Sequence, residues 1–368
     1  MLDVAFVGAG ANPAVQDGSG FSMAYRHGEA FDRLDGCDLV AVADVVPDNA
    51  DAFAEYFGVD AAFESHEELL EAVGPDVVSV CTPPKAHAEI VVDCLRSGVV
   101  DAVHCEKPMA STWLECRRMH EAAVETDTQL TFNHQRRFGR PFRRAKELLK
   151  DGAIGELRRV EFAAPNLYDY GTHSFDLCNH FNDDRDVEWV IGQLDYREED
   201  RWFGVHNENQ ALVSWEYDNG VDGLAATGPV GSDLVGCHNR LVGEAGTIEI
   251  GRGFPTDETD DRVLRVRHDV SDGWEHVDAD DEGLHGDASA EYGTTYIDRA
   301  VEHVVDALRD GTTPQLGSAN ALRGTELVFA AWHSARERAR VDLPLDVDDN
   351  PLAAMVDDGQ LTPDSTDG

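Results

Sequence analysis

Three residues whose side chains could transfer protons or bind a metal ion lie within the stretch GTHSFDLCNH, residues 171–180. They are His173, Asp176 and His180. An imidazole whose pKa lies near neutrality suits a general base, and two imidazoles with a carboxylate are also typical zinc ligands. In a helix, the three side chains fall on one face within about 60°, because each residue turns the helix by about 100°. This pattern is compatible with three interpretations: a proton-transfer site, a metal site, or an ordinary helix whose polar side chains are hydrogen-bonded.

Proton transfer fits the spacing better than a metal site does. Cys178 is the nearest candidate for a further metal ligand, but it points away from the face that carries the other three. The spacing of Asp176 and His180 relative to His173 spreads the ligands over two helical turns, about 10 Å, which is too far for one ion. We therefore expect no metal here.

The charge of the chain limits its partners and its environment. The 368 residues include 72 Asp and Glu against 30 Lys and Arg, a formal net charge of -42. Phosphate binding needs a basic face, so no nucleic-acid partner is expected. Self-repulsion of this size is best tolerated in salt, where the Debye length falls to about 3 Å at 1 M. The charge predicts a halophile; ordinary acidic solubility is the alternative.

Apolar runs and cysteines indicate the compartment. No apolar run approaches the length of a bilayer, and the N-terminus does not resemble a secretory signal, so we expect a cytoplasmic protein without a membrane partner. The 7 cysteines are scattered and contain no C-x-x-C pair, which indicates reduced thiols.

Two styles of patterning divide the chain. Four apolar runs alternate with four amphipathic stretches up to about residue 130, which predicts a doubly wound parallel sheet. Beyond that point, strands joined by short turns predict an antiparallel sheet, followed by two helices. The apolar runs are 2–8, 38–44, 76–83 and 100–106, and the amphipathic stretches are 23–34, 49–58, 66–74 and 87–98; the later strands are 154–165, 209–228, 239–253 and 261–270, and the later helices 294–311 and 318–339.

The expected architecture is an α/β Rossmann domain over residues 1–132, followed by an α+β domain over 133–345. The second domain should contain a large, mainly antiparallel open sheet. Residues 346–368 are acidic and predict a solvated tail.

Glycines at the end of the first predicted strand indicate a dinucleotide. Gly8 and Gly10 would provide the tight turn and the close approach to a pyrophosphate. The third glycine of the usual pattern is missing, and about ten extra residues precede Gly18 and Gly20. Asp44, at the end of the second strand, would bind the ribose hydroxyls and repel a 2′-phosphate, so we expect NAD rather than NADP. An ordinary turn and a helix-capping Asp44 are the alternatives.

CTPPKAHAEI (residues 81–90) and HCEKPMA (residues 104–110) add a resemblance to these patterns. With the glycine pair, Asp44, NHQRRF (133–138), GAIGELRRV (152–160), Asp176, His180 and VDLPL (341–345), they resemble the Gfo/Idh/MocA family of nicotinamide-dependent oxidoreductases. The resemblance covers nearly the whole chain. It implies a sugar or polyol substrate, and a homo-oligomer, dimer or tetramer, that associates through the open sheet.

The resemblance also implies roles for single residues. Lys107 matches the catalytic lysine of the family, and Asp176 and His180 match its D-x-x-x-H pair. Asn133 would approach the nicotinamide or the substrate, whereas Arg136 and Arg137 are expected in surface or interdomain ion pairs. The implied cofactor-binding residues are Gly8, Gly10, Asp44, Thr82, Pro83, His87, Glu106 and Lys107, and the implied substrate-binding residues are Lys107, Tyr168, His173, Asp176 and His180.

Some of these residues have a second interpretation from their chemistry alone. His87 could cap its helix instead of reaching the cofactor, and tyrosines such as Tyr168 more often pack than bind hydroxyl groups. Oxidation of a secondary alcohol needs a base for the hydroxyl proton, and His180 is the candidate. Lys107 would then stabilise the negative charge that develops on the oxygen.

The sequence thus predicts an NAD-dependent oxidoreductase acting on a sugar, polyol or sugar derivative. Two alternatives remain: a non-catalytic regulator that binds NAD or sugar, and a redox-neutral glycosidase that uses NAD transiently.

Overall fold

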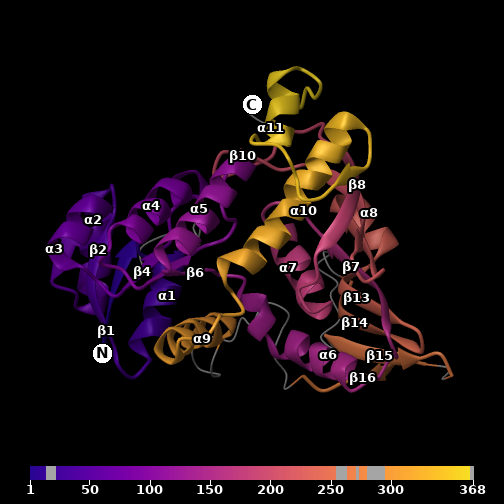
Figure 1. Ribbon diagram of the computed structural model, residues 1–368, viewed down its shortest axis with the longest axis horizontal. Helices are drawn as coiled ribbons and strands as arrows, with labels where there is room; N and C mark the ends of the chain where they lie inside the picture. Colours follow the sequence, from indigo (N-terminus) through magenta and orange to yellow (C-terminus); the bar gives the residue numbers. More distant parts are fainter. Residues whose placement is uncertain (14–21, 254–262, 271–272, 280–294, 365–368) are drawn as a thin grey trace. The chain divides into compact units, whose positions relative to one another are not determined.

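The computed structural model describes residues 1–13, 22–253, 263–270, 273–279 and 295–364. Gly18 and Gly20, in the extended loop noted in the sequence, lie outside the described residues. The chain forms two compact units (Figure 1). The first consists of Met1–Gln135 and Tyr296–Leu322, and the second of Arg136–Thr295 and Arg323–Gly368.

The first unit contains a parallel sheet of six strands among its described residues, in the order β3-β2-β1-β4-β5-β6. This is the doubly wound order that the first half of the sequence predicts. The strands are β1 (Leu2–Val7), β2 (Cys37–Ala43), β3 (Ala61–Phe63), β4 (Val77–Val80), β5 (Ala102–Cys105) and β6 (Gln129–Phe132). The helices are α1 (Met23–Asp32), α2 (Pro47–Phe57), α3 (His66–Val73), α4 (Pro84–Arg96), α5 (Trp113–Thr126) and α9 (Tyr296–Asp310).

Local sequence explains where these helices begin and end. Thr112 and Glu115 form a reciprocal capping box at the start of α5. Gly58 and Gly74 end α2 and α3 in the left-handed conformation, which costs glycine little because it lacks a Cβ atom. Central strands such as β4 are buried on both faces, in agreement with their continuous apolar sequences.

Helix α9 belongs to the first unit, although it follows the second domain in the sequence. It lies beside α1 (Figure 1), and its Val301 and Val305 belong to one apolar cluster with Phe31 of α1. Arg33 of α1 forms an ion pair with Asp298 of α9. The first unit therefore includes residues 296–322, which the sequence prediction had within the domain 133–345, because this distant segment supplies an amphipathic helix that packs on α1.

The second unit contains a nine-stranded sheet among its described residues, in the order β16-β15-β14-β13-β7-β12-β11-β8-β17. Neighbouring strands are antiparallel except β7 and β12, which run parallel. The predicted mainly antiparallel sheet is therefore confirmed. The strands are β7 (Leu157–Ala164), β8 (Val187–Asp195), β11 (Gln210–Tyr217), β12 (Asp222–Thr227), β13 (Cys237–Gly243), β14 (Gly246–Arg252), β15 (Leu264–His268), β16 (Glu275–His276) and β17 (Val341–Asp342), and β9 (Arg201–Trp202) pairs with β10 (Val205–His206).

Helix α7 (Gly171–Phe181) carries the candidate residues and packs against the sheet of the second unit (Figure 1). Phe175 fixes it, with its ring centroid 4.8 Å from that of Phe162 on β7 and 5.2 Å from that of Trp215 on β11. The other helices of this unit are α6 (Arg140–Lys150), α8 (Gly228–Leu234) and α11 (Pro351–Asp357); the 3-10 helix η1 (Gln135–Phe138) and α10 (Ser318–Glu337) begin in the first unit and continue into the second.

The C-terminal segment is more ordered than the predicted solvated tail. Asn350 caps α11 by accepting a hydrogen bond from the Ala353 N–H at 3.0 Å. Leu352 and Met355 of this helix are buried. The acidic composition of the segment conceals this apolar pair, which is sufficient to dock one short helix.

Among the described helices, none combines the length and the hydropathy that a membrane span requires.

Candidate active site

The end of β1 has the close backbone packing expected of a dinucleotide site. Gly8 has a φ of +88°, and a Cβ atom there would lie 2.6 Å from the Thr82 methyl carbon and 2.9 Å from the Thr82 backbone nitrogen. Only glycine fits this position. Gly10 also has a positive φ, +66°, but faces open space.

Asp44 lies beside this glycine turn, as predicted. Its carboxylate accepts hydrogen bonds from the Gly10 N–H at 3.0 Å and from the Val46 N–H at 2.8 Å. Carboxylate oxygens have about two acceptor sites each, so these bonds leave capacity for ribose hydroxyls.

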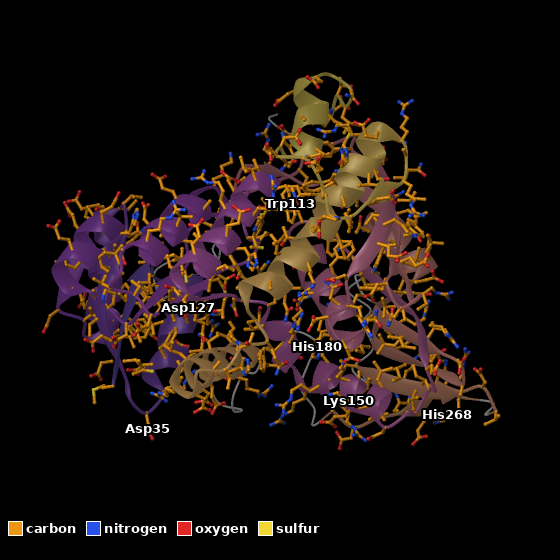
Figure 2. The ribbon with its side chains drawn as sticks, viewed as in Figure 1. Asp35, Trp113, Asp127, Lys150, His180 and His268 are labelled. Atoms are coloured by element: carbon orange, nitrogen blue, oxygen red, sulfur yellow. The ribbon has the colours of Figure 1, made fainter. Side chains whose placement is uncertain are left out.

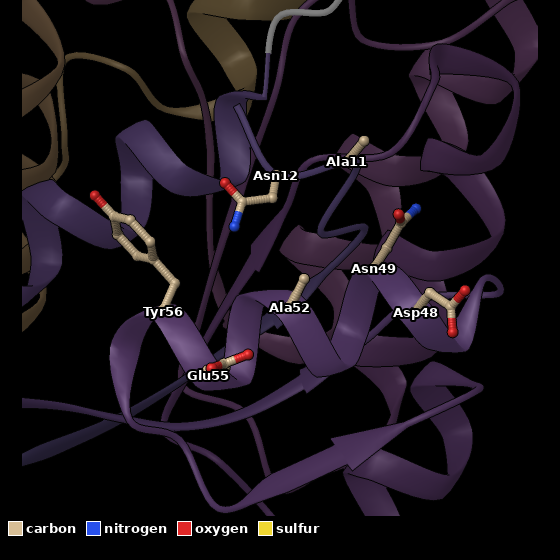
Figure 3. A pocket seen from close by; sticks show the side chains of 7 residues that line it. All are labelled: Ala11, Asn12, Asp48, Asn49, Ala52, Glu55 and Tyr56. Atoms are coloured by element: carbon tan, nitrogen blue, oxygen red, sulfur yellow. The ribbon is translucent and has the colours of Figure 1, made fainter. Parts of the chain in front are cut away.

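A hollow of about 570 Å³ adjoins the glycine turn and α2 (Figure 3). Among the residues that the structure describes, its lining is acidic or neutral and contains no lysine or arginine that could bind an additional phosphate. The lining residues are Ala11, Asn12, Asp48, Asn49, Ala52, Glu55 and Tyr56. This lining suits an adenosine without a 2′-phosphate better than one that carries it.

The segment after β4 also fits a nicotinamide dinucleotide. The Thr82 hydroxyl oxygen is buried and has no hydrogen-bond partner among the described residues, so it is available to a ligand. Pro83 is the N-cap residue of α4. A dinucleotide bound here would supply the hydride acceptor or donor, and Gly8, Gly10, Asp44 and Thr82 would hold it.

His87 joins two loops of this edge. One ring nitrogen, Nε2, lies 2.7 Å from the Thr82 carbonyl oxygen, and Nδ1 lies 3.0 Å from that of Pro108. The ring is fully buried. His87 therefore ties the segment after β4 to the Lys107-Pro108 loop, a structural role that the sequence did not indicate.

Glu106 fixes the backbone that carries Lys107. Its Oε1 accepts hydrogen bonds from His27 Nε2 at 2.9 Å and from Asn133 Nδ2 at 2.7 Å, and its Oε2 accepts one from the Lys107 N–H at 3.1 Å. Burial raises the pKa of Glu106, but these partners outweigh it and hold the pKa well below its usual value. Sequence reasoning missed His27, which lies 79 residues before Glu106 in the chain.

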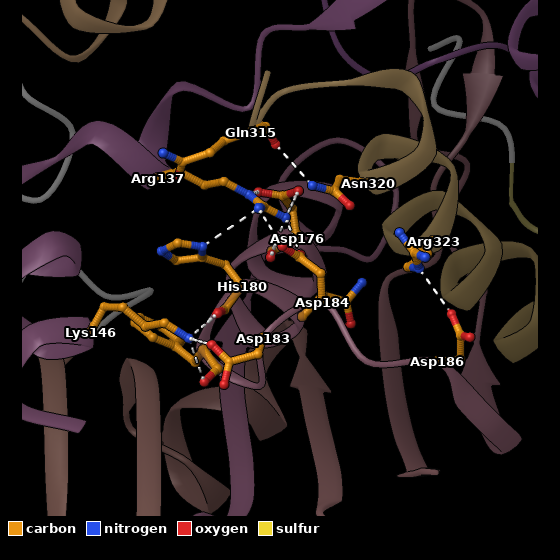
Figure 4. Close-up of polar contacts among 12 residues, drawn as sticks. Arg137, Lys146, Asp176, His180, Asp183, Asp184, Asp186, Gln315, Asn320 and Arg323 are labelled. Atoms are coloured by element: carbon orange, nitrogen blue, oxygen red, sulfur yellow. Dashed lines mark hydrogen bonds and ion pairs between the residues drawn. The ribbon is translucent and has the colours of Figure 1, made fainter. Parts of the chain in front are cut away.

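In the second unit, Arg137 holds the Asp176 carboxylate. Its Nε donates to Asp176 Oδ2 at 2.7 Å, and its Nη2 donates to Asp176 Oδ1 at 2.8 Å and to Asp184 Oδ1 at 2.8 Å (Figure 4). The Arg137 side chain is fully buried. The expectation of a surface or interdomain ion pair is therefore wrong for Arg137, and its bidentate geometry has the form typical of strong carboxylate pairs.

His180 lies among cationic groups at the end of α7 (Figures 2 and 4). Its Nδ1 is 3.5 Å from Arg137 Nη1. Burial, with Arg137, Lys146 and Lys150 nearby, lowers the His180 pKa to about 2. The ring is therefore neutral, and because Nδ1 faces an N–H donor, the ring proton belongs on Nε2.

Lys146 holds the end of α7. Its ammonium donates to the His180 carbonyl oxygen at 2.6 Å, to the Phe181 carbonyl oxygen at 3.1 Å and to Asp183 Oδ1 at 2.6 Å (Figure 4). A cation at the C-terminal end of a helix also interacts favourably with the helix dipole.

The remaining predicted substrate residues are buried. Tyr168 is fully buried and stacks on Trp332 with ring centroids 5.9 Å apart, which favours packing over hydroxyl binding. His173 is buried on α7. Asp176 pairs with Arg137, so its connection to His180 runs through the guanidinium.

A second arginine in the 3-10 helix η1 also lies in the interior. The Arg136 Nη1 is 2.6 Å from His238 Nε2, and its guanidinium lies over the Tyr170 ring at 5.7 Å. Arg136 is buried, so the expected surface location is wrong here as well. His238 was not singled out in the sequence, because a lone histidine in a strand carries no motif.

The fold and these residues define a class: a dinucleotide-binding α/β unit joined to an α+β unit that carries a buried acidic and imidazole site. Residues 3–134 match the family model described as "Oxidoreductase family, NAD-binding Rossmann fold", and residues 158–343 match "Oxidoreductase family, C-terminal alpha/beta domain". The chain belongs to the Gfo/Idh/MocA oxidoreductase family.

Curated relatives are inositol and glucoside dehydrogenases. Myo-inositol 2-dehydrogenase of Thermotoga maritima is 33% identical over 130 residues, which are 35% of this chain and 38% of that protein. D-glucoside 3-dehydrogenase of Escherichia coli is 33% identical over 36% of this chain and 37% of its own length. The matched region thus spans well under half of these two relatives. scyllo-Inositol 2-dehydrogenase (NAD(+)) of Bacillus subtilis is 24% identical over 87% of this chain and 93% of its own length.

Solved structures share the whole fold. An oxidoreductase from Agrobacterium radiobacter, in complex with NAD+, L-tartaric acid and magnesium, has a TM-score of 0.72 at 21% identity and covers 93% of this chain and 98% of its own. Aldose-aldose oxidoreductase from Caulobacter crescentus has a TM-score of 0.72 at 19% identity, with 93% and 99% covered.

Proposed function

We propose that the protein is an NAD-dependent oxidoreductase that transfers a hydride between the nicotinamide and a CH–OH or carbonyl group of a sugar or polyol. The observation that carries the proposal is the neutral, partly buried His180 beside an Asp176 carboxylate that Arg137 holds in place, in a chain that also has the Lys107 motif. A non-catalytic sensor does not require such a site. The inositol and glucoside dehydrogenases among the relatives support a polyhydroxylated substrate.

The chemistry follows from the charges near the reacting oxygen. Loss of hydride from an alcohol carbon goes with loss of the hydroxyl proton, so negative charge develops on that oxygen. We assign Lys107 and His180 to this oxygen as hydrogen-bond donors, His180 through its Nε2–H, and the hydroxyl proton passes to water. Asp176 and Arg137 hold the His180 ring in the tautomer that carries its proton on Nε2.

The cofactor preference follows from Asp44 and the hollow next to it. Asp44, Asp48 and Glu55 supply negative charge at this edge. A 2′-phosphate would be repelled there, so NAD is the cofactor proposed for this site, in line with the NAD-binding family model.

The test measures reduced nicotinamide by absorbance in high-salt buffer, with NAD and a panel of inositols, aldoses, glycosides and sugar acids. Wild type should turn over at least one substrate, and Lys107→Ala and His180→Ala should each lose activity by about 100-fold or more. Lys85→Ala, which changes an exposed lysine on α4, is the matched control and should retain activity. Tight NAD binding without turnover would favour a regulator, whereas sugar release without net NADH would favour a glycosidase.

We also propose a homo-oligomer that uses the sheet of the second unit. Ile191 on β8 and Leu212 on β11 are exposed to 48% and 41%. They lie on neighbouring strands of one sheet, and exposed apolar residues on a sheet are typical of an interface. Light scattering coupled to size exclusion should give a dimer or larger, and Ile191→Asp with Leu212→Asp should shift it to the monomer.

A further inference from the structure

One cysteine of the 7 differs from the rest in its surroundings. Cys81, directly after β4, is partly exposed, whereas Cys37, Cys94, Cys105, Cys116, Cys178 and Cys237 are all buried. Burial raises the pKa of each of these buried thiols, which keeps them protonated and unreactive. Cys81 is therefore the thiol that a small reagent can reach.

Cys81 also has an ordered set of partners within the first unit. Its Sγ lies 3.6 Å from His27 Nδ1, and His27 Nε2 lies 2.9 Å from Glu106 Oε1. A thiol, an imidazole and a carboxylate thus follow one another from β4 to α1 to the end of β5. This order is the arrangement by which proteins activate a nucleophilic thiol.

The carboxylate end of this series is fixed in its charged form. Glu106 accepts from His27 and Asn133, and its pKa is lowered despite burial. An ionised Glu106 accepts a hydrogen bond from the His27 Nε2–H. This leaves His27 Nδ1 without a proton of its own, so it can receive one from the Cys81 thiol.

The groups around His27 are compatible with proton transfer from Cys81 to His27, the step that we call the relay. Burial lowers the pKa of His27, but Cys81 and Glu106 outweigh it and raise the pKa above its usual value. His104 stacks on His27 with ring centroids 5.1 Å apart, and burial together with His27 lowers its pKa, so its ring stays neutral. Ser79 Oγ lies 3.0 Å from His27 Nδ1 and 3.7 Å from Cys81 Sγ, and its hydroxyl can bridge the two.

We propose that Cys81, with His27 and Glu106, forms a reactive-thiol site at the edge of the dinucleotide site, and that electrophiles and peroxides modify the protein there. With a peroxide, the sulfur gives two electrons to the O–O bond, one oxygen becomes the sulfenic S–OH, and the other leaves as water after taking the thiol proton through His27. With an alkyl iodide, an S–C bond forms, iodide leaves and His27 takes the proton.

The position of Cys81 couples this modification to cofactor binding. A Cβ atom at Gly8 would lie 3.0 Å from the Cys81 carbonyl carbon, so the thiol residue borders the glycine turn. The next residue, Thr82, supplies the buried hydroxyl that has no hydrogen-bond partner among the described residues. A group added to Cys81 therefore occupies space that the dinucleotide needs, and bound NAD should in turn shield the thiol.

The experiment treats the full-length folded protein with iodoacetamide and follows each cysteine by peptide mass spectrometry. Cys81 should react at least about 10-fold faster than the buried cysteines. Saturating NAD should slow the labelling of Cys81, and the labelled protein should bind NAD at least about 10-fold more weakly. Hydrogen peroxide followed by dimedone should place the sulfenic acid on the same residue.

Two variants test whether Cys81 is labelled fast because His27 assists it or only because it is exposed. His27→Gln should slow Cys81 labelling by about 10-fold or more, provided circular dichroism shows that it is folded, while Cys37→Ala should leave the rate unchanged. In wild type, no preference for Cys81 over the buried thiols, or a labelling rate of Cys81 that saturating NAD leaves unchanged, would overturn the proposal without reference to any variant. Because both readouts are labelling rates, they stand even if no substrate turns over.

Discussion

Arg137 is the residue on which the geometry of the second unit's candidate site depends most. It compensates two carboxylates, Asp176 and Asp184, and is itself fully buried. Arg137→Met leaves the buried Asp176 charge without a partner, so we expect a loss of about 3–5 kcal/mol in the free energy of unfolding. Urea denaturation in high salt measures it. Arg144→Met is the control: Arg144 is an exposed arginine paired with Glu147, and its loss should change the free energy by about 0.5 kcal/mol or less.

Two roles of His180 can be distinguished by mutation: donation of a hydrogen bond from Nε2 and uptake of a proton. Glutamine can donate a hydrogen bond at the position of Nε2 but cannot take up a proton. If His180 serves as a donor, as its lowered pKa and its contact with Arg137 favour, His180→Gln should keep about a tenth or more of kcat, while His180→Ala loses about 100-fold or more. Equal loss in both variants would make His180 the base that the sequence suggested. The wild-type kcat/KM should show no loss of activity from His180 protonation above about pH 4, because the His180 pKa lies near 2.

Asp44 should decide the choice of dinucleotide. Asp44→Ser removes the carboxylate and keeps a small hydrogen-bonding side chain. The ratio of kcat/KM for NAD to that for NADP should fall by about 10-fold or more, because the repulsion of the 2′-phosphate is lost. Asp48→Ser, which changes another acidic residue of the same hollow, should have a smaller effect. An unchanged ratio in Asp44→Ser would remove this residue from the discrimination.

Among the helices and strands, those elements could be predicted that a short stretch of sequence specifies by itself. The buried strands of the first unit and the Gly8 turn are as predicted, because each is encoded by an apolar run or by a glycine requirement within a few residues. The spacing of His173, Asp176 and His180 was considered for a helix, and the structure has one there, α7. The place of α9 in the first unit was not predictable, because its apolar face fits either domain until the chain is folded. The partners of Glu106 and Asp176 were missed for the same reason: His27 lies 79 residues from Glu106, and Arg137 lies 39 residues from Asp176.

Glu208 links three elements of the second unit and gives a test by pH. Its carboxylate accepts from the Leu167 N–H at 2.7 Å, the Thr227 hydroxyl at 3.1 Å and the Trp332 indole N–H at 3.0 Å. Burial raises its pKa to about 7, although the three donors act in the opposite direction. A carboxyl group with a raised folded pKa stabilises most below its unfolded pKa of about 4.3, and this contribution falls as the pH rises to about 7.

Replacement of Glu208 removes this pH dependence. Wild type should lose about 3 kcal/mol of unfolding free energy from this group between pH 5 and pH 8, and Glu208→Gln should lose less, since it cannot ionise. Chemical denaturation at both pH values measures the difference. Glu216→Gln is the matched control, because Glu216, on β11, also accepts a hydrogen bond from a tryptophan N–H, that of Trp189 at 3.0 Å. If the wild-type and Glu208→Gln slopes coincide, the three donors keep Glu208 ionised throughout.

For the whole molecule, the net charge of -42 decides how stability depends on salt. With 72 acidic and 30 basic residues, most carboxylates have no cation to pair with, so the folded chain carries a repulsion that unfolding relieves. Screening shortens the range of that repulsion from about 10 Å at 0.1 M to about 3 Å at 1 M salt, which is less than the spacing of most surface charges. The folded chain should therefore be most stable at high salt.

The melting temperature should therefore rise by about 10 °C or more between 0.1 M and 2 M KCl, since each kcal/mol shifts the melting temperature of a large domain by a few degrees. Sucrose at equal osmolality, which stabilises by exclusion but screens nothing, separates the two effects and should give a smaller rise. Thermal scans at several salt concentrations should show the steepest rise below about 1 M, where the Debye length changes most. A melting temperature that is flat or falls with KCl would mean that neighbouring basic side chains already compensate the acidic ones, and that the charge serves solubility alone.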